Sequence, residues 1–427
     1  MNRRKRLLAL VSALGLMTAS LAGCGDSGQD SGSDSGKSGG DSSGESITLM
    51  IPDWGVPSDE LLDEFTAESG IDVEVDVVGW DDIRDKVSIA AAGNKAAADV
   101  FEVDWSWTGE FHSADWLEPI ELSEDEIASM PSIQSFMVDG QVLALPYAND
   151  YRIAFYNTED FEKAGIESEP KTWDEVYENG KKIKEEGIKE YPLTIPMSAE
   201  ESSTTALIWL SFAKHGVVFN EDGTLNKDAV LDTLTYMDKI NKEELINPAN
   251  RTASGMDTYR QLTSGEASFM VGPTSFVGRV NDPEESQVVD KVVPVLVPGE
   301  NGPAEQTFAL PEGVGVSKFS ENKEAAMEFV KWYNSAETQE KLYDDKNIIP
   351  TRTEVLEKLI EDGKIKNAGA MLEESKLIKS PFPKGVPNYY TEMSKAMFDA
   401  INKMAIGQAS PEQAFDEMDS RIKELAQ

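Results

Sequence analysis

The sequence is poor in the residues that most often build redox and metal chemistry. It contains one cysteine, Cys24, and two histidines, His112 and His215. A single cysteine excludes an intramolecular disulfide and a cluster of thiolate ligands. Two histidines exclude a histidine-rich metal site and leave little material for a Ser-His-Asp triad. We therefore expect no metal, no cofactor and no catalytic centre of these kinds.

Positive charge is also scarce. Lysine and arginine number 39 against 78 acidic residues, which gives a formal charge of −39. Removal of residues 1–23 would delete four basic residues and no acidic ones, and would change this charge to −43. Nucleic acids and anionic lipid surfaces attract positive charge, so neither is an expected partner. We interpret the acidity as a means of solubility.

Long apolar runs are absent except near the N-terminus. Residues 7–17 are mostly apolar and follow a basic stretch at residues 3–6, which is typical of a signal peptide. The string Leu21-Ala22-Gly23-Cys24 resembles the lipobox of bacterial lipoproteins. This resemblance implies cleavage after residue 23, lipid on Cys24, and anchoring at the outer face of the cell membrane. Residues 24–46 then form the lipidated cysteine and a Gly/Ser/Asp tether.

From residue 46 onward, strand patterns alternate with helical ones. Residues 71–77 alternate apolar and acidic side chains, as a half-buried strand does, and Thr172 opens a capping box with Glu175. The alternation predicts an α/β protein with parallel strands joined by helices. Strands are expected at 47–51, 71–77, 100–103, 153–156, 191–195, 267–271, 292–297 and 314–316. The main helices are expected at 82–92, 204–214, 228–240, 323–333, 337–343, 353–360, 389–406 and 411–425, with others opening at Ser58 and Thr172.

An ordered set of segments resembles one protein family. These segments are residues 99–120, residues 139–157, residues 264–272, and the Pro350-Thr351-Arg352 turn. They resemble the sugar-binding lipoproteins of ABC importers that are related to maltose-binding protein, with departures at Leu262 and Ser268. The resemblance covers residues 47–427 and lies in the order of the segments rather than in any single one.

The resemblance implies a type II periplasmic-binding-protein fold, in which two α/β lobes are joined by three crossings and close on a ligand at the hinge. One lobe is expected to comprise 47–152 plus 283–322, and the other 153–282 plus 323–427. The implied function is capture of a carbohydrate and its delivery to the permease subunits of an ABC transporter, without enzymatic activity. The protein is expected to act as a monomer.

Candidate ligand-binding residues lie where the strands end, because ligands of open α/β sheets bind beyond the carboxyl ends of strands. Aromatic faces suit the C–H face of a sugar, and carboxylates and amides suit its hydroxyls. Related sugar binders suggest Trp209, and Tyr389 begins a helix after a Pro/Gly-rich stretch. The candidates are Trp54, Asp104, Trp105, Trp107, Tyr147, Asn149, Asp150, Trp209, Gly272 and Tyr389. Replacing Trp54 or Trp105 with Ala is expected to weaken sugar binding without unfolding the protein.

Two alternatives remain open at this point. An extracellular glycosidase would need two carboxylates at a defined separation, and 78 acidic residues make candidate pairs uninformative. A binding protein of the same fold for a polyamine, or for another small solute, would also suit the acidity and the Trp/Asp loop. Titration of tryptophan fluorescence with sugars and with spermidine separates these ligands.

Overall fold

The computed structural model describes residues 45–427, except for the side chain of Asp81. The predicted signal peptide, the predicted lipid on Cys24 and most of the predicted tether therefore lie outside the described residues. The strands are β1 Glu45–Ile51, β2 Ile71–Val77, β3 Val100–Asp104, β4 Met137–Val138, β5 Gln141–Val142, β6 Leu145–Ala148, β7 Arg152–Asn157, β8 Leu193–Thr194, β9 Phe269–Pro273, β10 Val292–Val295 and β11 Glu312–Val316.

Helices cover these strands and make up the C-terminal region. The α-helices are α1 Asp59–Ser69, α2 Trp80–Ala92, α3 Thr108–Ser113, α4 Glu124–Ser129, α5 Thr158–Lys163, α6 Trp173–Glu185, α7 Glu201–His215, α8 Lys227–Lys242, α9 Gly255–Thr263, α10 Phe276–Arg279, α11 Lys323–Tyr333, α12 Ala336–Lys346, α13 Thr353–Glu361, α14 Gly369–Ser375, α15 Tyr390–Ala405 and α16 Pro411–Leu425. Four short 3-10 helices are η1 Asp53–Gly55, η2 Trp105–Trp107, η3 Pro131–Phe136 and η4 Pro248–Arg251.

The first lobe is built on a five-stranded sheet in the order β2-β1-β3-β11-β6. Strands β2, β1 and β3 are parallel, as the alternation predicts, whereas β11 and β6 are antiparallel to their neighbours. Ile47, Leu49 and Ile51 of β1 are buried against Phe329 of α11. The parallel strands therefore direct their carboxyl ends to one edge of the sheet.

Local sequence signals fix the helix ends in both lobes. The Ser58 side chain accepts a hydrogen bond from Leu61 N at the start of α1, and Gly70 ends that helix with φ of 76°. At α6 the capping box of Thr172 and Glu175 is present, which confirms the prediction. These caps are local, so they can be read from the chain without knowledge of its packing.

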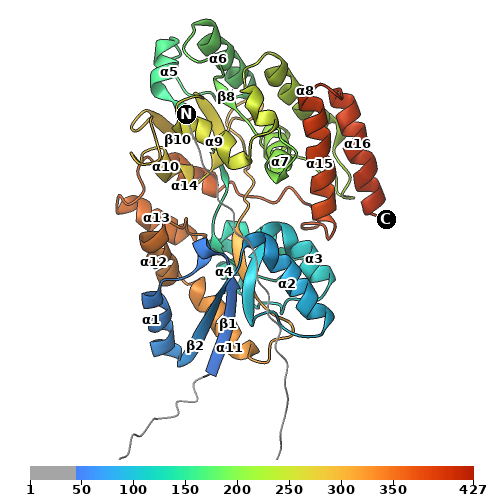
Figure 1. Cartoon of the computed structure of the whole chain (residues 1–427). Helices are drawn as coiled ribbons and strands as arrows, with labels where there is room; N and C mark the ends of the chain where they lie inside the picture. Colours follow the sequence, from blue (N-terminus) through green and yellow to red (C-terminus); the bar gives the residue numbers. More distant parts are fainter. Residues whose placement is uncertain (1–44) are drawn as a thin grey trace, which may run out of the picture. The chain divides into compact units, whose positions relative to one another are not determined.

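The second lobe is built on a four-stranded sheet in the order β10-β7-β9-β8. Strand β9 is antiparallel to β7 and parallel to β8. Helices α7, α8, α15 and α16 pack on one another beside this sheet (Figure 1). Their buried residues join one hydrophobic cluster with Trp173 and Phe269.

Three of the expected lobe assignments are wrong. Residues 292–295 were expected in the first lobe, but β10 pairs antiparallel with β7 of the second sheet. Helix α11 was expected in the second lobe, but Phe329 and Val330 pack with β1 and β11 of the first sheet. Helix α12 was also expected in the second lobe, but its Leu342 packs in the core cluster of the first. The sequence shows that these segments are buried, but it does not show which sheet buries them.

The chain passes between the two sheets three times, as the resemblance implies. The passages lie between β6 and β7, between β10 and β11, and between α12 and α13. They are hydrogen-bonded to one another: Leu310 N donates to Asp150 O over 2.6 Å, and Asn149 N donates to Ile349 O over 2.9 Å. The three passages therefore form one connected hinge.

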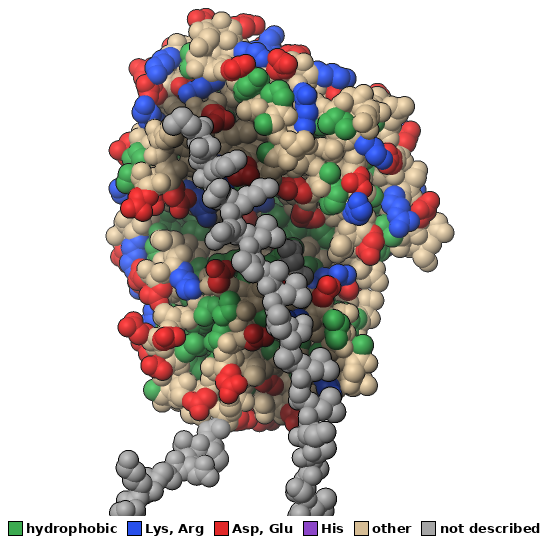
Figure 2. All heavy atoms as spheres, viewed as in Figure 1, with side chains coloured by type: hydrophobic (Ala, Val, Ile, Leu, Met, Phe, Trp, Pro, Cys, Tyr) green, Lys and Arg blue, Asp and Glu red, His purple; other side chains and the backbone are tan. Residues whose placement is uncertain are grey.

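The surface of the described region is charged and mixed. On the face that Figure 2 shows, acidic and basic side chains are interspersed. Among residues 45–427, no helix combines the length and the apolar character needed to cross a membrane.

Candidate ligand-binding site

Trp54 and Glu312 meet at the carboxyl edge of the first sheet. Trp54 lies in η1, directly after β1, and its side chain is among the exposed large apolar groups at 46%. Its Nε1–H donates to Glu312 Oε2 over 2.6 Å. Glu312 begins β11, 258 residues further along the chain. This bond holds an exposed indole in one orientation beside a carboxylate.

Tyr147 supports this pair from below. Its ring is fully buried, and its hydroxyl donates to the same Glu312 Oε2 over 3.0 Å. A Cβ on Gly55 would lie 2.4 Å from the Tyr147 hydroxyl, so only glycine fits next to Trp54. The structure therefore places Tyr147 beneath the site, where it positions Glu312 and does not face a ligand.

Asp104 ends β3 directly opposite Glu312. Its Oδ1 accepts a hydrogen bond from Ser106 N over 2.8 Å. Burial raises the pKa of Asp104 to about 6, against the hydrogen bonds from Ser106. Burial raises the pKa of Glu312 to about 7, and the charges of Asp104 and Asp150 add to this while the bonds from Trp54 and Tyr147 oppose it. Carboxyl groups whose pKa values lie this close to neutral pH can be protonated or ionised, so they can donate or accept hydrogen bonds.

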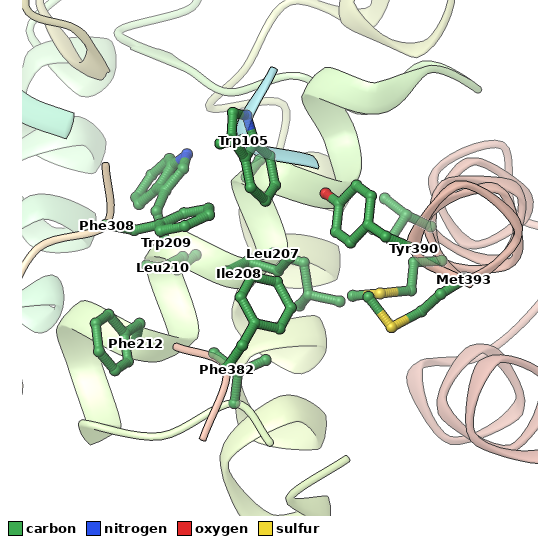
Figure 3. Packing of buried hydrophobic residues seen from close by; sticks show 14 of the residues in the cluster. Trp105, Leu207, Ile208, Trp209, Leu210, Phe212, Phe308, Phe382, Tyr390 and Met393 are labelled. Atoms are coloured by element: carbon green, nitrogen blue, oxygen red, sulfur yellow. The ribbon is translucent and has the colours of Figure 1, made fainter. Parts of the chain in front are cut away.

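Trp105 crosses from the first lobe into aromatic side chains of the second. Its ring lies 5.1 Å from Phe308, 4.9 Å from Tyr390 and 6.2 Å from Phe382, measured between ring centroids. Figure 3 shows Trp105 and Tyr390 pointing toward one another, with Phe382 beside them. Only 4% of Trp105 is exposed. Its expected role as a ligand surface gives way to one in packing between the lobes.

Trp107 and Trp209 are also buried. Trp107 packs against Trp80 at 5.0 Å, and Trp209 packs against Trp173 at 5.7 Å. Both belong to the hydrophobic core. The apolar pattern around Trp209 indicates a core position, and the structure agrees with that pattern. It does not agree with the ligand-binding role that related sugar binders suggested for Trp209.

Asn149 and Asp150 lie in the first passage of the hinge. The Asn149 side chain donates to Pro350 O over 3.4 Å, while its Oδ1 is buried without a partner. Asp150 accepts two bonds from Arg152 Nη1, over 2.9 and 3.0 Å. Arg152 keeps a buried Nε without a hydrogen-bond partner.

Gly272 and Tyr389 lie away from Trp54. Gly272 pairs with Ile153 inside the second sheet, and a Cβ there would lie 2.7 Å from the Met270 methyl. Tyr389 is partly buried and lines a cavity of about 210 Å³ together with Phe219 and Phe382. Neither residue touches the Trp54–Glu312 pair in any contact of the described residues.

Sequence reasoning missed two acidic residues of this region. Glu312 follows a proline and begins a short apolar strand, a position that carries no local signal. Glu201 begins α7, and its carboxylate accepts hydrogen bonds from the hydroxyls of Tyr390 and Ser394. Burial raises the pKa of Glu201, and nearby Asp104 adds to the effect. We call Trp54, Asp104, Asp150, Glu201 and Glu312 the inter-lobe site.

The described residues hold no grouping of three His, Cys, Asp or Glu side chains that could bind a metal ion. The chemistry of the inter-lobe site is that of hydrogen bonding and aromatic contact.

Comparison with known proteins identifies the family. Residues 52–340 match the bacterial extracellular solute-binding proteins, and the chain belongs to this family. This assignment confirms the expectation of a carrier that binds a solute without transforming it.

Individual relatives are distant. A binding protein of Brucella abortus is 23% identical over 364 residues, which are 83% of this chain and 86% of the relative. The diacetylchitobiose-binding protein of Streptomyces coelicolor is 26% identical and covers 52% of this chain and 50% of its own length. A maltose-bound protein of T. maritima is 24% identical, covers 89% of this chain and 99% of its own, and superposes with a TM-score of 0.72. A solute-binding protein of Agrobacterium radiobacter in complex with ribitol is 20% identical, covers 90% of this chain and 99% of its own, and has a TM-score of 0.75. These structures share the two-lobed fold.

Proposed function

We propose that this chain captures a sugar outside the cell and delivers it to the permease of an ABC transporter. The observation that carries the proposal is the exposed Trp54 indole, held by Glu312 at the carboxyl edge of the first sheet. An indole face accepts the C–H face of a sugar ring, and adjacent carboxyl oxygens accept its hydroxyls. Relatives whose names include diacetylchitobiose and maltotriose support a carbohydrate, and an oligosaccharide in particular.

Ligand retained from the cell is the most direct test. Residues 47–427 should be purified under native conditions and then denatured. Mass spectrometry of the released material should detect a carbohydrate. Isothermal titration of the emptied protein with maltotriose, diacetylchitobiose and ribitol should then identify a binding sugar. Trp54→Ala should weaken this binding at least tenfold.

Trp332→Phe provides the matched control. Trp332 lies on α11 and packs against Phe65 and Phe329 in the core of the first lobe. This substitution should leave sugar affinity unchanged. Equal affinity for wild type and Trp54→Ala would remove the basis of the proposal.

A polyamine is the second candidate. Four acidic residues of the inter-lobe site act on one another through their charges. The charge of Asp104 raises the pKa of Glu201, and the charges of Asp104 and Asp150 raise the pKa of Glu312. Such a group of carboxylates attracts an ammonium ion. Titration with spermidine tests this candidate, and binding of spermidine without any sugar would favour it.

We further propose that the protein is a lipoprotein anchored through Cys24, which lies outside the described residues. The basis is the signal-like N-terminus and the Leu21–Cys24 string. Cys24→Ala should move the protein from the membrane fraction to the medium and leave sugar affinity unchanged. A membrane-bound Cys24→Ala protein would contradict the anchor. The protein is proposed to act as a monomer, which light scattering at micromolar concentration tests.

A further inference from the structure

Asp104 and Glu312 form a cross-strand pair of carboxyl groups. They are directly opposite in the antiparallel ladder of β3 and β11. Directly opposed residues project on the same face of a sheet, with Cβ atoms about 4.5–5.5 Å apart. Two negative charges at such positions repel one another, so the pair is costly when both groups are ionised.

One carboxyl oxygen of Glu312 accepts hydrogen bonds from other residues of the protein, and the other does not. Oε2 accepts from both Trp54 Nε1 and the Tyr147 hydroxyl. Among the described residues, Oε1 accepts no hydrogen bond, and it is not one of the buried atoms that lack a partner. Oε1 is therefore within reach of solvent, beside the exposed Trp54 ring.

The groups that face this pair are mostly acidic or neutral. Glu102 lies on β3 opposite Val314, is fully buried, and has no hydrogen-bond partner on either carboxyl oxygen. Asp150 faces Glu312 from the hinge and is paired with Arg152. Glu201 faces Asp104 from α7. The phenols of Tyr147 and Tyr333 complete the surroundings, and both remain protonated because their pKa values are raised.

These surroundings favour a pair that holds a proton. Burial is the largest cause of the raised pKa values of Asp104, about 6, and Glu312, about 7. A pair with one proton offers one donor and one acceptor, which is the pattern that a sugar hydroxyl presents in return.

We propose that Asp104 and Glu312 share a proton and together determine specificity, binding a hydroxyl of an uncharged sugar ring that lies on Trp54. This inference rests on the proposed function and adds the charge state of the ligand and of the site. A neutral ligand seated on the pair removes water from it, which disfavours the ionised form further. Sugar binding therefore takes up protons, and affinity falls as the pH rises. An ammonium ligand has the opposite effect, because it favours ionised carboxylates.

The test measures sugar affinity against pH in wild type and in Glu312→Gln. The probe is whichever of maltotriose, diacetylchitobiose or ribitol binds most tightly, and spermidine is titrated in parallel. Calorimetry from pH 5.5 to 8.5, in two buffers of different ionisation enthalpy, gives both affinity and proton uptake. Glutamine keeps an oxygen that can accept the hydrogen bond from the Trp54 N–H, so the orientation of the Trp54 ring is preserved. Glu60→Gln, on the exposed face of α1, is the matched control.

In wild type and in Glu60→Gln, sugar affinity should fall by up to about tenfold per pH unit above about pH 7, with net proton uptake at pH 7. In Glu312→Gln the profile should be nearly flat above about pH 7, where Asp104, with a pKa of about 6, is already ionised. A wild-type sugar affinity that is independent of pH, or that rises with it, overturns the inference and leaves the proposed function standing. A Glu312→Gln profile parallel to wild type also overturns it. Binding of spermidine alone, or of no probe, overturns the proposed function and this inference together.

Discussion

Replacement of Trp105 by Ala separates packing from ligand contact. The indole is 4% exposed and lies against Phe308, Phe382 and Tyr390. Truncation of a buried tryptophan to alanine costs about 3–5 kcal/mol, and lost aromatic pairs add about 0.5–1.5 kcal/mol each to the burial effect. Trp54→Ala removes a half-exposed ring and should change stability by less than about 1 kcal/mol. The two variants should therefore differ by at least about 2 kcal/mol.

Urea denaturation followed by far-UV circular dichroism measures this difference. The expected result is a clearly lower midpoint for Trp105→Ala and a near-wild-type midpoint for Trp54→Ala. This reverses the expectation from sequence that both variants would stay stable. Sugar affinity, measured at temperatures where both variants are folded, should be lost mainly in Trp54→Ala. A Trp105→Ala protein with the wild-type midpoint and lost affinity would refute the packing role.

Four further substitutions, one of them a control, test the electrostatics, the packing and a helix cap. Burial raises the pKa of Glu374 to about 8, so the folded state holds a proton that the unfolded state releases above about pH 4.5, and the stability of the wild type falls as the pH rises between these values. Glu374→Gln should remove this slope, so its free energy of unfolding relative to wild type should rise by about 3–5 kcal/mol from pH 5 to pH 8. Urea midpoints that run parallel to those of wild type across this range would contradict the prediction. A Cβ on Gly109 would lie 1.9 Å from Val386 O, so Gly109→Ala should cost about 1–3 kcal/mol. Gly278→Ala is the control for Gly109→Ala, because a Cβ at Gly278 would meet open space, and it should leave the melting temperature unchanged. Thr172→Ala removes the α6 cap and should cost about 1 kcal/mol in thermal melts; an unchanged melt would show that the cap contributes nothing.

Local patterns predicted much of the fold. Helices α11 and α16 have the bounds that their apolar periodicity predicts, and β2 matches the alternation of residues 71–77. Other strands are shorter than predicted: residues 191–195 give only β8, Leu193–Thr194, because pairing with β9 is confined to those residues. Strand β6 was missed, since its four residues carry a proline and no alternation.

The candidate site was predicted in part. Trp54 and Asp104 follow strand ends, and the rule that ligands bind beyond the carboxyl ends of strands placed them correctly at one edge of the sheet. The same rule could not separate Trp54 from Trp105 and Trp107, because a tryptophan after a strand reads alike whether it packs or points to solvent. Glu312 was invisible for another reason: its partners are Trp54 and Tyr147, both more than a hundred residues away.

The sequence by itself determined the helix caps and the periodicity of the buried faces, since these depend on residues a few positions apart. It also determined the family, through the order of similar segments along residues 47–427. Tertiary structure alone decided which sheet takes β10, which lobe takes α11, and which tryptophan stays exposed. It also brought Glu312 opposite Asp104, at the end of an antiparallel ladder that closes a long loop of chain. Such pairings depend on the register between distant strands, and the periodicity of a single strand fixes which face is buried but not which neighbour it meets.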